Sequence, residues 1–189
     1  AFSFIKKHLD EGRQAYIVCP MIEDSDSDLQ SVCSYAEKIS GNEFKNYRVG
    51  LLHGKMSPAE KDSTMAEFKN GNIDLLVCTT VIEVGVDVPN AVIMLIENSE
   101  RFGLSQLHQL RGRVGRGREK SYCILITDNV SEDTLHRVRV MSSTSDGFKI
   151  SEEDLKTRGP GDFFGQKQHG LPDLRIADIS SDMELVRLT

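Results

Sequence analysis

The sequence predicts an α/β protein in which helices cover both faces of a mostly parallel sheet. Short, wholly apolar runs alternate along the chain with segments of helical periodicity, and such runs are typical of strands buried on both sides. The connections between the runs are too long for hairpins, which favours parallel strands joined by helices. Ligands bind such sheets at the carboxyl ends of the strands, so the residues that follow each strand are the first functional candidates.

The first elements follow in the order that such a sheet requires. Residues 2–11 have helical spacing and stop at Gly12, a favourable residue for a helix end. The run "AYIVC" (15–19) predicts a buried strand. The acidic stretch 23–28 is expected to form a solvated loop, and 29–40 predicts a second helix.

The middle of the chain continues the alternation. A strand is predicted over 48–54, followed by the helix "SPAEKDSTMAEFKNG". Ser57 and Glu60 have capping-box spacing, and Pro58 between them occupies the first helical position. Gly71 is expected to close this helix. Further strands are predicted over 73–79, 91–97 and 121–127, and a short helix is predicted over 104–113.

The composition changes after about residue 128, so we expect two parts, 1–128 and 129–189. The second part begins with a helix that has Ser131 as its N-cap candidate. Another helix is expected to start with a capping box from Ser151 to Asp154 and to complete an antiparallel hairpin. A Gly- and Pro-rich extended segment, "RGPGDFFGQKQHGLPDL", follows.

The totals exclude several classes of protein. A chain of 189 residues buries roughly 70% of its unfolded surface and needs no disulfide or metal for stability. Its four cysteines lack ligand spacing and are expected to be reduced thiols of a cytoplasmic protein. No run approaches the length of a membrane span, so we expect no membrane partner. Ala1 already lies within a helical pattern, which indicates a piece of a longer chain.

One segment stands out against the formal net charge of -6. The stretch "QLHQLRGRVGRGREK" leaves a local charge of +4 over residues 100–120. Arginine binds phosphate oxygens in a bidentate manner, and the interleaved glycines allow the backbone to approach a ligand closely. A solvated basic turn is the alternative. The arginines of this segment are Arg111, Arg113, Arg116 and Arg118.

Other candidates follow the predicted strands. Thr79 and Thr80 lie where a helix N-terminus, which attracts phosphate, could begin. Asp87 follows at the same sheet edge and is equally compatible with a turn residue. His53 and Gly54 end another strand, although a single histidine there is more often structural.

Taken together, "AYIVCP", "LLHGKM", "DLLVCTTVIEVGVDVPNA" and "QLHQLRGRVGRG" resemble the ordered motifs of the second RecA-like domain of superfamily 2 helicases. The resemblance implies that Arg113 and Arg116 are arginine fingers, which reach the γ-phosphate of ATP held with Mg²⁺ by a first RecA-like domain. It further implies a nucleotide side that comprises Gly85, Asp87, Gln109 and Gly112. His53, Gly54, Thr79 and Thr80 would contact the nucleic acid or link the two sites.

The end of the chain, "DGFKISEEDLKTRGPGDFFGQKQHGLP", resembles the RecG helicase family, which remodels branched DNA such as stalled forks and Holliday junctions. In that family a helical hairpin and a Thr-Arg-Gly motif couple ATP hydrolysis to movement on duplex DNA. The corresponding residues would be Thr157, Arg158 and Gly159, with Gln168 as a further DNA contact. Alternatively, Arg158 could be a partner of helix-end carbonyls.

The resemblance sets the partners and the location that we expect. The partners are forked double-stranded DNA, the first RecA-like domain and an N-terminal wedge domain of the same chain, in the cytoplasm at the nucleoid. The sequence lacks the G-x-x-x-x-G-K-[ST] phosphate loop and an acidic D-E-x-[HQ] box, so this segment alone should not hydrolyse ATP. The motor of a transcription-repair coupling factor, a non-enzymatic nucleic-acid adaptor and a phosphate-binding regulator remain alternatives.

Overall fold

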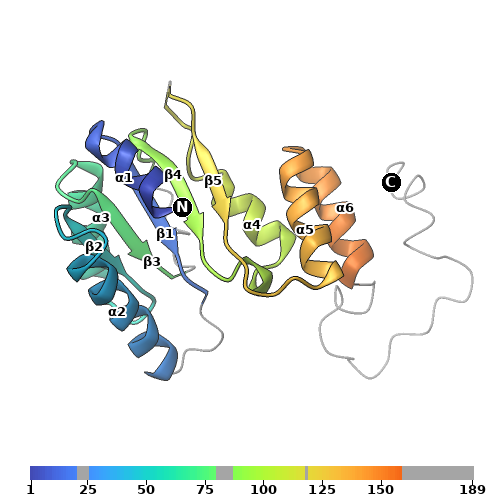
Figure 1. The fold of residues 1–189 in the computed structure, drawn as a ribbon, viewed down its shortest axis with the longest axis horizontal. Helices are drawn as coiled ribbons and strands as arrows, with labels where there is room; N and C mark the ends of the chain where they lie inside the picture. Colours follow the sequence, from blue (N-terminus) through green and yellow to red (C-terminus); the bar gives the residue numbers. More distant parts are fainter. Residues whose placement is uncertain (21–25, 80–86, 118, 159–189) are drawn as a thin grey trace, which may run out of the picture.

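A computed structural model describes residues 1–20, 26–79, 87–117 and 119–158, and it contains the predicted parallel sheet. Five strands lie in the order β2-β3-β1-β4-β5, and all four pairings between them are parallel (Figure 1). All five residues of the central strand β1 are buried, as its apolar sequence requires. The strands are β1 (Gln14–Val18), β2 (Val49–Leu52), β3 (Leu75–Cys78), β4 (Ala91–Ile96) and β5 (Tyr122–Leu125).

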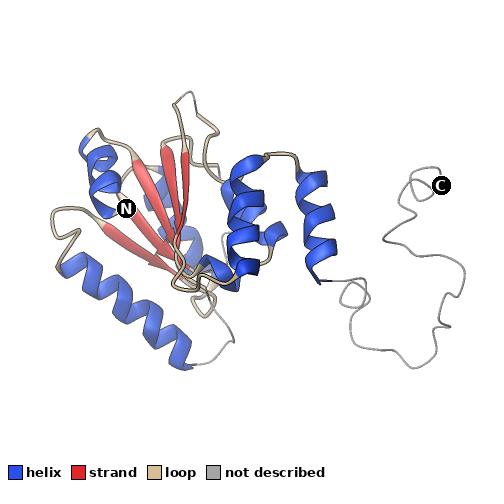
Figure 2. Ribbon diagram, turned by 45° about the vertical axis from the view of Figure 1, so that its right-hand side comes forward, coloured by secondary structure: helices blue, strands red, loops and turns tan. Residues whose placement is uncertain are grey.

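Helices cover both faces of this sheet (Figure 2). Each face has its own cluster of buried apolar side chains. One cluster joins α1 (Phe2–Asp10) and α2 (Asp26–Gly41) to the sheet. The other joins α3 (Pro58–Lys69) and α4 (Leu104–Arg111) to the opposite face, with a short 3-10 turn, η1 (Ser99–Arg101), before α4. The prediction of an α/β fold with helices on both faces of a parallel sheet is therefore confirmed.

Two more helices pack side by side beyond the sheet and contact α4 (Figures 1 and 2). They are α5 (Glu132–Ser143) and α6 (Gly147–Arg158), joined by three residues, and they form the predicted helical hairpin. Their buried side chains Val140, Met141 and Ile150 belong to the same apolar cluster as α4. The hairpin is thus an extension of the core on the α4 side of the sheet.

Most of the predicted helix ends are found. Ser57 and Glu60 form the capping box, and the Ser131 hydroxyl accepts from the Thr134 amide. Gly12 and Gly71 have φ values of 77° and 78°, a left-handed conformation in which glycine is unstrained. These local signals were readable because each lies within four residues of the helix that it ends.

Two predictions about the helices were wrong. Helix α2 begins at Asp26, inside the acidic stretch that was expected to be a loop, because acidic residues are favourable at a helix N-terminus. The capping box from Ser151 to Asp154 does not exist, since α6 begins four residues earlier, at Gly147. The carboxylate of Asp146 accepts from the Phe148 amide at 2.9 Å and provides the start of α6 instead.

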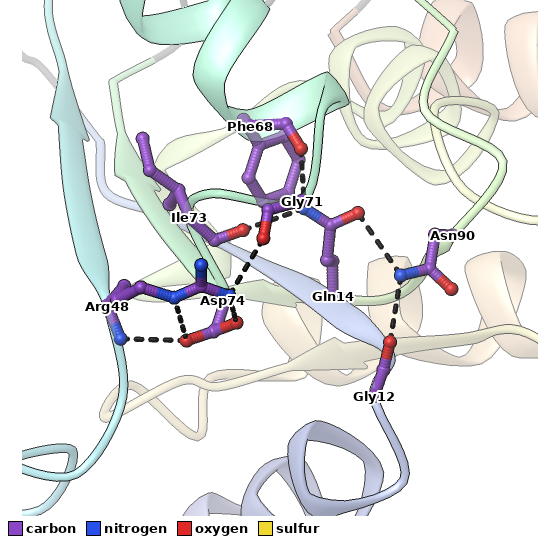
Figure 3. Close-up of polar contacts among 8 residues, drawn as sticks. All are labelled: Gly12, Gln14, Arg48, Phe68, Gly71, Ile73, Asp74 and Asn90. Carbon is purple, nitrogen blue, oxygen red and sulfur yellow. Dashed lines mark hydrogen bonds and ion pairs between the residues drawn. The ribbon is translucent and has the colours of Figure 1, made fainter.

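The amino edge of the sheet is closed by a polar network around Gln14 (Figure 3). The Gln14 side chain is only 3% exposed, and its amide donates to the carbonyls of Phe68 (2.5 Å) and Ile73 (2.7 Å). The Asn90 amide donates to the Gln14 side-chain oxygen and to the Gly12 carbonyl. One glutamine therefore ties the end of α3 to the central strand.

Arg48 and Asp74 form a second tie at the same edge, between β2 and β3 (Figure 3). The guanidinium donates to both carboxylate oxygens of Asp74, and one of its nitrogens also reaches the Gly71 carbonyl at 2.7 Å. Burial acts to raise the pKa of Asp74, but the hydrogen bonds and charge of Arg48 outweigh it, so that the pKa is lowered. Asp74 is consequently ionised at neutral pH.

We expect Gln14→Met to lower the free energy of unfolding by about 2–4 kcal/mol, because two buried carbonyls lose their donor while the side-chain volume is kept. Urea denaturation measures this change. Asn72→Ala, at an exposed position of the same edge, should change stability by less than about 0.5 kcal/mol. Equal stabilities of the two variants would contradict the role assigned to Gln14.

Candidate functional site

The carboxyl edge of the sheet brings His53 and Thr79 together. Leu52 and Cys78 are paired across β2 and β3, and the Thr79 amide donates to the Leu52 carbonyl at 3.1 Å. Thr79 is fully buried, and its hydroxyl has no hydrogen-bond partner within the described ranges. Thr80 and Gly85, also predicted for this site, lie outside the described residues.

His53 has the environment of a neutral imidazole. Burial lowers its pKa, and the nearby Lys61 charge lowers it further against the opposing effect of Glu60. Its Nδ1 atom is buried and has no partner in the described part of the chain. The Lys61 ammonium donates to the Gly54 carbonyl at 2.6 Å, which fixes the turn after β2. His53 can therefore offer a hydrogen bond at pH 7, but not a positive charge.

Arg116 and Asp87 connect the loop after α4 with the loop before β4. Their side chains form an ion pair at 2.5 Å and are 44% and 52% exposed. The Arg116 Nε atom also donates to the Gly112 carbonyl. An exposed pair of this kind contributes roughly 0–1 kcal/mol, so that another anion can replace Asp87 at small cost.

The glycines of the arginine-rich segment have structural reasons to be glycine. Gly115 has a φ of 83°, and a Cβ atom on Gly117 would lie 2.6 Å from the Pro89 carbonyl oxygen. The two loops are therefore packed against each other at backbone level. Any side chain at position 117 would force the backbone of the two loops apart at Pro89.

The Arg113 side chain makes no hydrogen bond or ion pair with the residues that the structure describes. It is partly buried and lies near Tyr16, on the central strand. Burial raises the pKa of the Tyr16 phenol, the Cys78 and Asp87 charges add to the rise, and the Arg113 charge opposes it. A guanidinium that lies close to a buried strand without a counter-ion is well suited to receive an anion.

Arg111 belongs to the same segment but has a different role. Its guanidinium donates to the carbonyls of Met141 (2.7 Å) and Thr144 (2.8 Å), at the end of α5, and contacts the His108 ring at 2.9 Å. These carbonyls belong to the last turn of a helix, where cations are favourable. The spacing of the arginines in the sequence gave no means of telling Arg111 from Arg113.

The other predicted residues divide between described and undescribed positions. Gln109 is exposed on α4, and Gly112 follows that helix as its C-cap. Thr157 and Arg158 are the last residues of α6. Gly159, Gln168 and Arg118 lie outside the described residues. The nucleotide and nucleic-acid roles of all these residues stay predictions.

The structure adds Asp154, whose part in the site the sequence did not indicate. Its carboxylate lies at the start of α4, where it accepts from the Ser105 hydroxyl at 3.0 Å and from the Leu104 amide at 3.4 Å. The residues in contact are 49 and 50 positions apart in the sequence, so no local pattern could reveal the pair. Asp154 had been interpreted as part of a capping box for its own helix.

The described residues hold no group of His, Cys, Asp and Glu that could bind a metal ion, and none of their helices could span a membrane. All four cysteines are free thiols, as expected. Burial raises the pKa of Cys19 to about 12 and that of Cys123 to about 11.

Comparisons with known proteins agree with this geometry. The family model of the helicase conserved C-terminal domain matches residues 1–118, and that of the C-terminal part of domain 3 of the ATP-dependent DNA helicase RecG matches 144–189. ATP-dependent DNA helicase RecG of Bacillus subtilis is 54% identical over 95% of this chain and 26% of its own length. RecG of Thermotoga maritima is 51% identical over 98% of this chain and 24% of its own length.

A solved structure of RecG bound to a three-way DNA junction is also similar. It matches with a TM-score of 0.75 and 48% identity, over 98% of this chain and 24% of that chain. The chain thus spans about a quarter of the length of these relatives.

We expect Arg111→Gln to lower the free energy of unfolding by about 1.5–3 kcal/mol, because two partly buried carbonyls lose a charged donor. Arg113→Gln should stay within about 0.5 kcal/mol of the wild type, since it breaks no bond among the described residues. Parallel urea denaturation of the two variants tests the distinction. Equal losses would show that the two arginines do not differ in this way.

Proposed function

The chain belongs to the family of helicase conserved C-terminal domains and corresponds to the C-terminal part of RecG, and from this premise we propose that it is half of a DNA motor. The motor would be an ATP-dependent helicase that remodels branched DNA, such as stalled forks, in the cytoplasm at the nucleoid. The similarity to RecG over nearly the whole chain favours this function over that of a polymerase-coupled motor.

The observation that supports the proposal most directly is how few partners the side chains of the two candidate arginine fingers have. Arg113 has no counter-ion among the described residues, and Arg116 is held by the exposed carboxylate of Asp87 and by one hydrogen bond to the Gly112 carbonyl. Both lie directly after α4, on loops that glycines bring together. Negative charge on a transferring phosphoryl group is stabilised by such arginines, which accelerate the reaction by ~10³–10⁵ in well-studied cases.

In this proposal Mg²⁺–ATP, held mainly by a first RecA-like domain, supplies the phosphoryl group. The residues of this chain would act from the opposite side of the cleft. Arg113 would contact the γ-phosphate, and Arg116 would exchange Asp87 for phosphate oxygens at small cost because their pair is exposed. Asp87, released from Arg116, could then accept from a hydroxyl of the nucleotide ribose, with Gly85, Gln109 and Gly112 forming the surface nearby.

The nucleic-acid side would be formed by the loops that follow β2 and β3. Neutral His53, the Gly54 turn and the buried Thr79 hydroxyl offer hydrogen bonds that position a DNA backbone without reading its sequence. Thr80 would belong to the same surface. Thr157, Arg158, Gly159 and Gln168 would follow the hairpin and convert closure of the cleft into movement along duplex DNA. We place the boundary between the two parts of the chain at residue 128.

We expect Arg113→Ala in the full-length protein to reduce ATP hydrolysis by at least about a hundredfold, because transition-state charge loses its stabiliser. Nucleotide affinity should change by only a few-fold, since the ground state needs this contact less. Steady-state hydrolysis and equilibrium binding of ADP measure the two quantities. Arg139→Ala, an exposed arginine on α5, is the matched control, and comparable hydrolysis in both variants would remove Arg113 from the reaction.

We expect Arg158→Ala in the full-length protein to leave ATP hydrolysis largely intact and to abolish unwinding of forked DNA. The reason is that Arg158 would transmit the closure of the cleft to the DNA and would not contact the phosphates of the nucleotide. Both activities are followed side by side at one salt concentration, because phosphate contacts are salt-dependent. Unchanged unwinding would mean that Arg158 only caps the end of α6.

A further inference from the structure

The helix that carries the arginine-rich segment lacks its own N-terminal cap. Helix α4 has eight residues, its N-cap is Gly103, and no acidic residue lies in its first turn. The Gln106 side chain accepts from the Gly103 amide at 3.0 Å, but this bond serves the residue before the helix. Helices this short are marginal in isolation, and their first amides need acceptors from elsewhere.

Helix α6 provides that acceptor. The Asp154 carboxylate contacts the first amide of α4, that of Leu104, and the hydroxyl of the next residue, Ser105. A carboxylate at a helix N-terminus is also favourable for the helix dipole. Asp154 thus supplies an acceptor to the N-terminus of α4 from the hairpin, at the first helical amide and not at the second or third amide that an N-cap residue serves.

The hairpin also holds the other end and the side of α4. Arg111, the last residue of α4, donates to Met141 and Thr144 at the end of α5. Ile150 of α6 is buried in the same apolar cluster as Leu107 and Leu110. A Cβ atom on Gly147 would lie 3.0 Å from the His108 ring, so that α6 approaches α4 closely. Attachments at both ends and along one side make α4 and the hairpin a single body.

We infer that Asp154 is a positioning residue for ATP hydrolysis: it keeps α4 helical, and therefore Arg113 in place, only while α6 is docked. Asp154 lies one turn before Arg158 on the same helix. A displacement of the end of α6 would consequently uncap α4 and disturb the segment that follows it. The part of this inference that concerns ATP rests on the proposed function, whereas the capping of α4 does not.

The test uses the full-length protein with Asp154→Ala, Asp154→Asn and the control Glu152→Ala. Glu152 lies two residues earlier on α6, is exposed and pairs with Lys156 on its own helix. Two quantities are measured: amide hydrogen exchange of residues 104–107 without nucleotide, and kcat and KM for ATP at saturating forked DNA.

We expect Asp154→Ala to accelerate exchange at the start of α4 about five-fold, the usual effect of a lost N-cap. It should lower kcat by about five-fold as well, with KM nearly unchanged, because the fingers act on the transition state. Asp154→Asn should recover most of both losses, since its amide oxygen still accepts from the Leu104 amide. Glu152→Ala should resemble the wild type.

Two results would overturn the inference: unchanged exchange and kcat in Asp154→Ala, or an equal loss in Glu152→Ala, which would indicate general weakening of α6. If Asp154→Ala does not fold, Asp154→Ser, which has no carboxylate, takes its place: faster exchange than in Glu152→Ala supports the inference, and equal exchange rejects it. If the wild-type protein did not hydrolyse ATP, the proposed function would fail, while the exchange rates would still decide whether Asp154 caps α4.

Discussion

Complete burial of the central strand β1 is the constraint on which the rest of the structure depends. A strand covered on both faces must satisfy its polar groups at its two ends, and these ends are treated differently. At the amino edge, Gln14 and Asn90 satisfy the neighbouring carbonyls and tie α3 to the sheet. At the carboxyl edge, His53 Nδ1 and Thr79 Oγ1 are buried and have no partner among the described residues. The polar side chains at the amino edge therefore stabilise the fold, whereas those at the carboxyl edge have hydrogen-bonding capacity that the described residues do not use.

The environments of the arginines, more than their sequence spacing, separate their roles. The Arg111 side chain binds helix-end carbonyls of α5, whereas Arg116 binds an exposed carboxylate and the Gly112 carbonyl, and the Arg113 side chain has no partner among the described residues. All three come from six consecutive residues of an acidic protein. The segment thus combines an attachment to the hairpin with two cations that can respond to an anion.

The sequence was sufficient for most of the fold because its signals are local. Apolar strands, the capping box at Ser57 and the glycines that end α1 and α3 are all defined by neighbours in the chain. Contacts between distant segments were not predictable: Asp154 had an equally plausible local role as a cap of α6, and Arg111 looked like the other arginines of its segment. The candidate residues at strand ends were found because a parallel sheet collects them at one edge, but their partners depend on tertiary packing.

The contacts of the arginine-rich loop and the contacts between α4 and the hairpin differ in strength, and this difference decides which of them would break first. The exposed Arg116–Asp87 pair contributes roughly 0–1 kcal/mol, whereas the two bonds from the Arg111 guanidinium to partly buried carbonyls together contribute about 1.5–3 kcal/mol. A phosphate that draws the arginine loop would separate the exposed pair long before it detached α4 from the hairpin. The loop can therefore change partners while the contacts of α4 with α5 and α6 persist, as the proposed coupling of hydrolysis to movement would require.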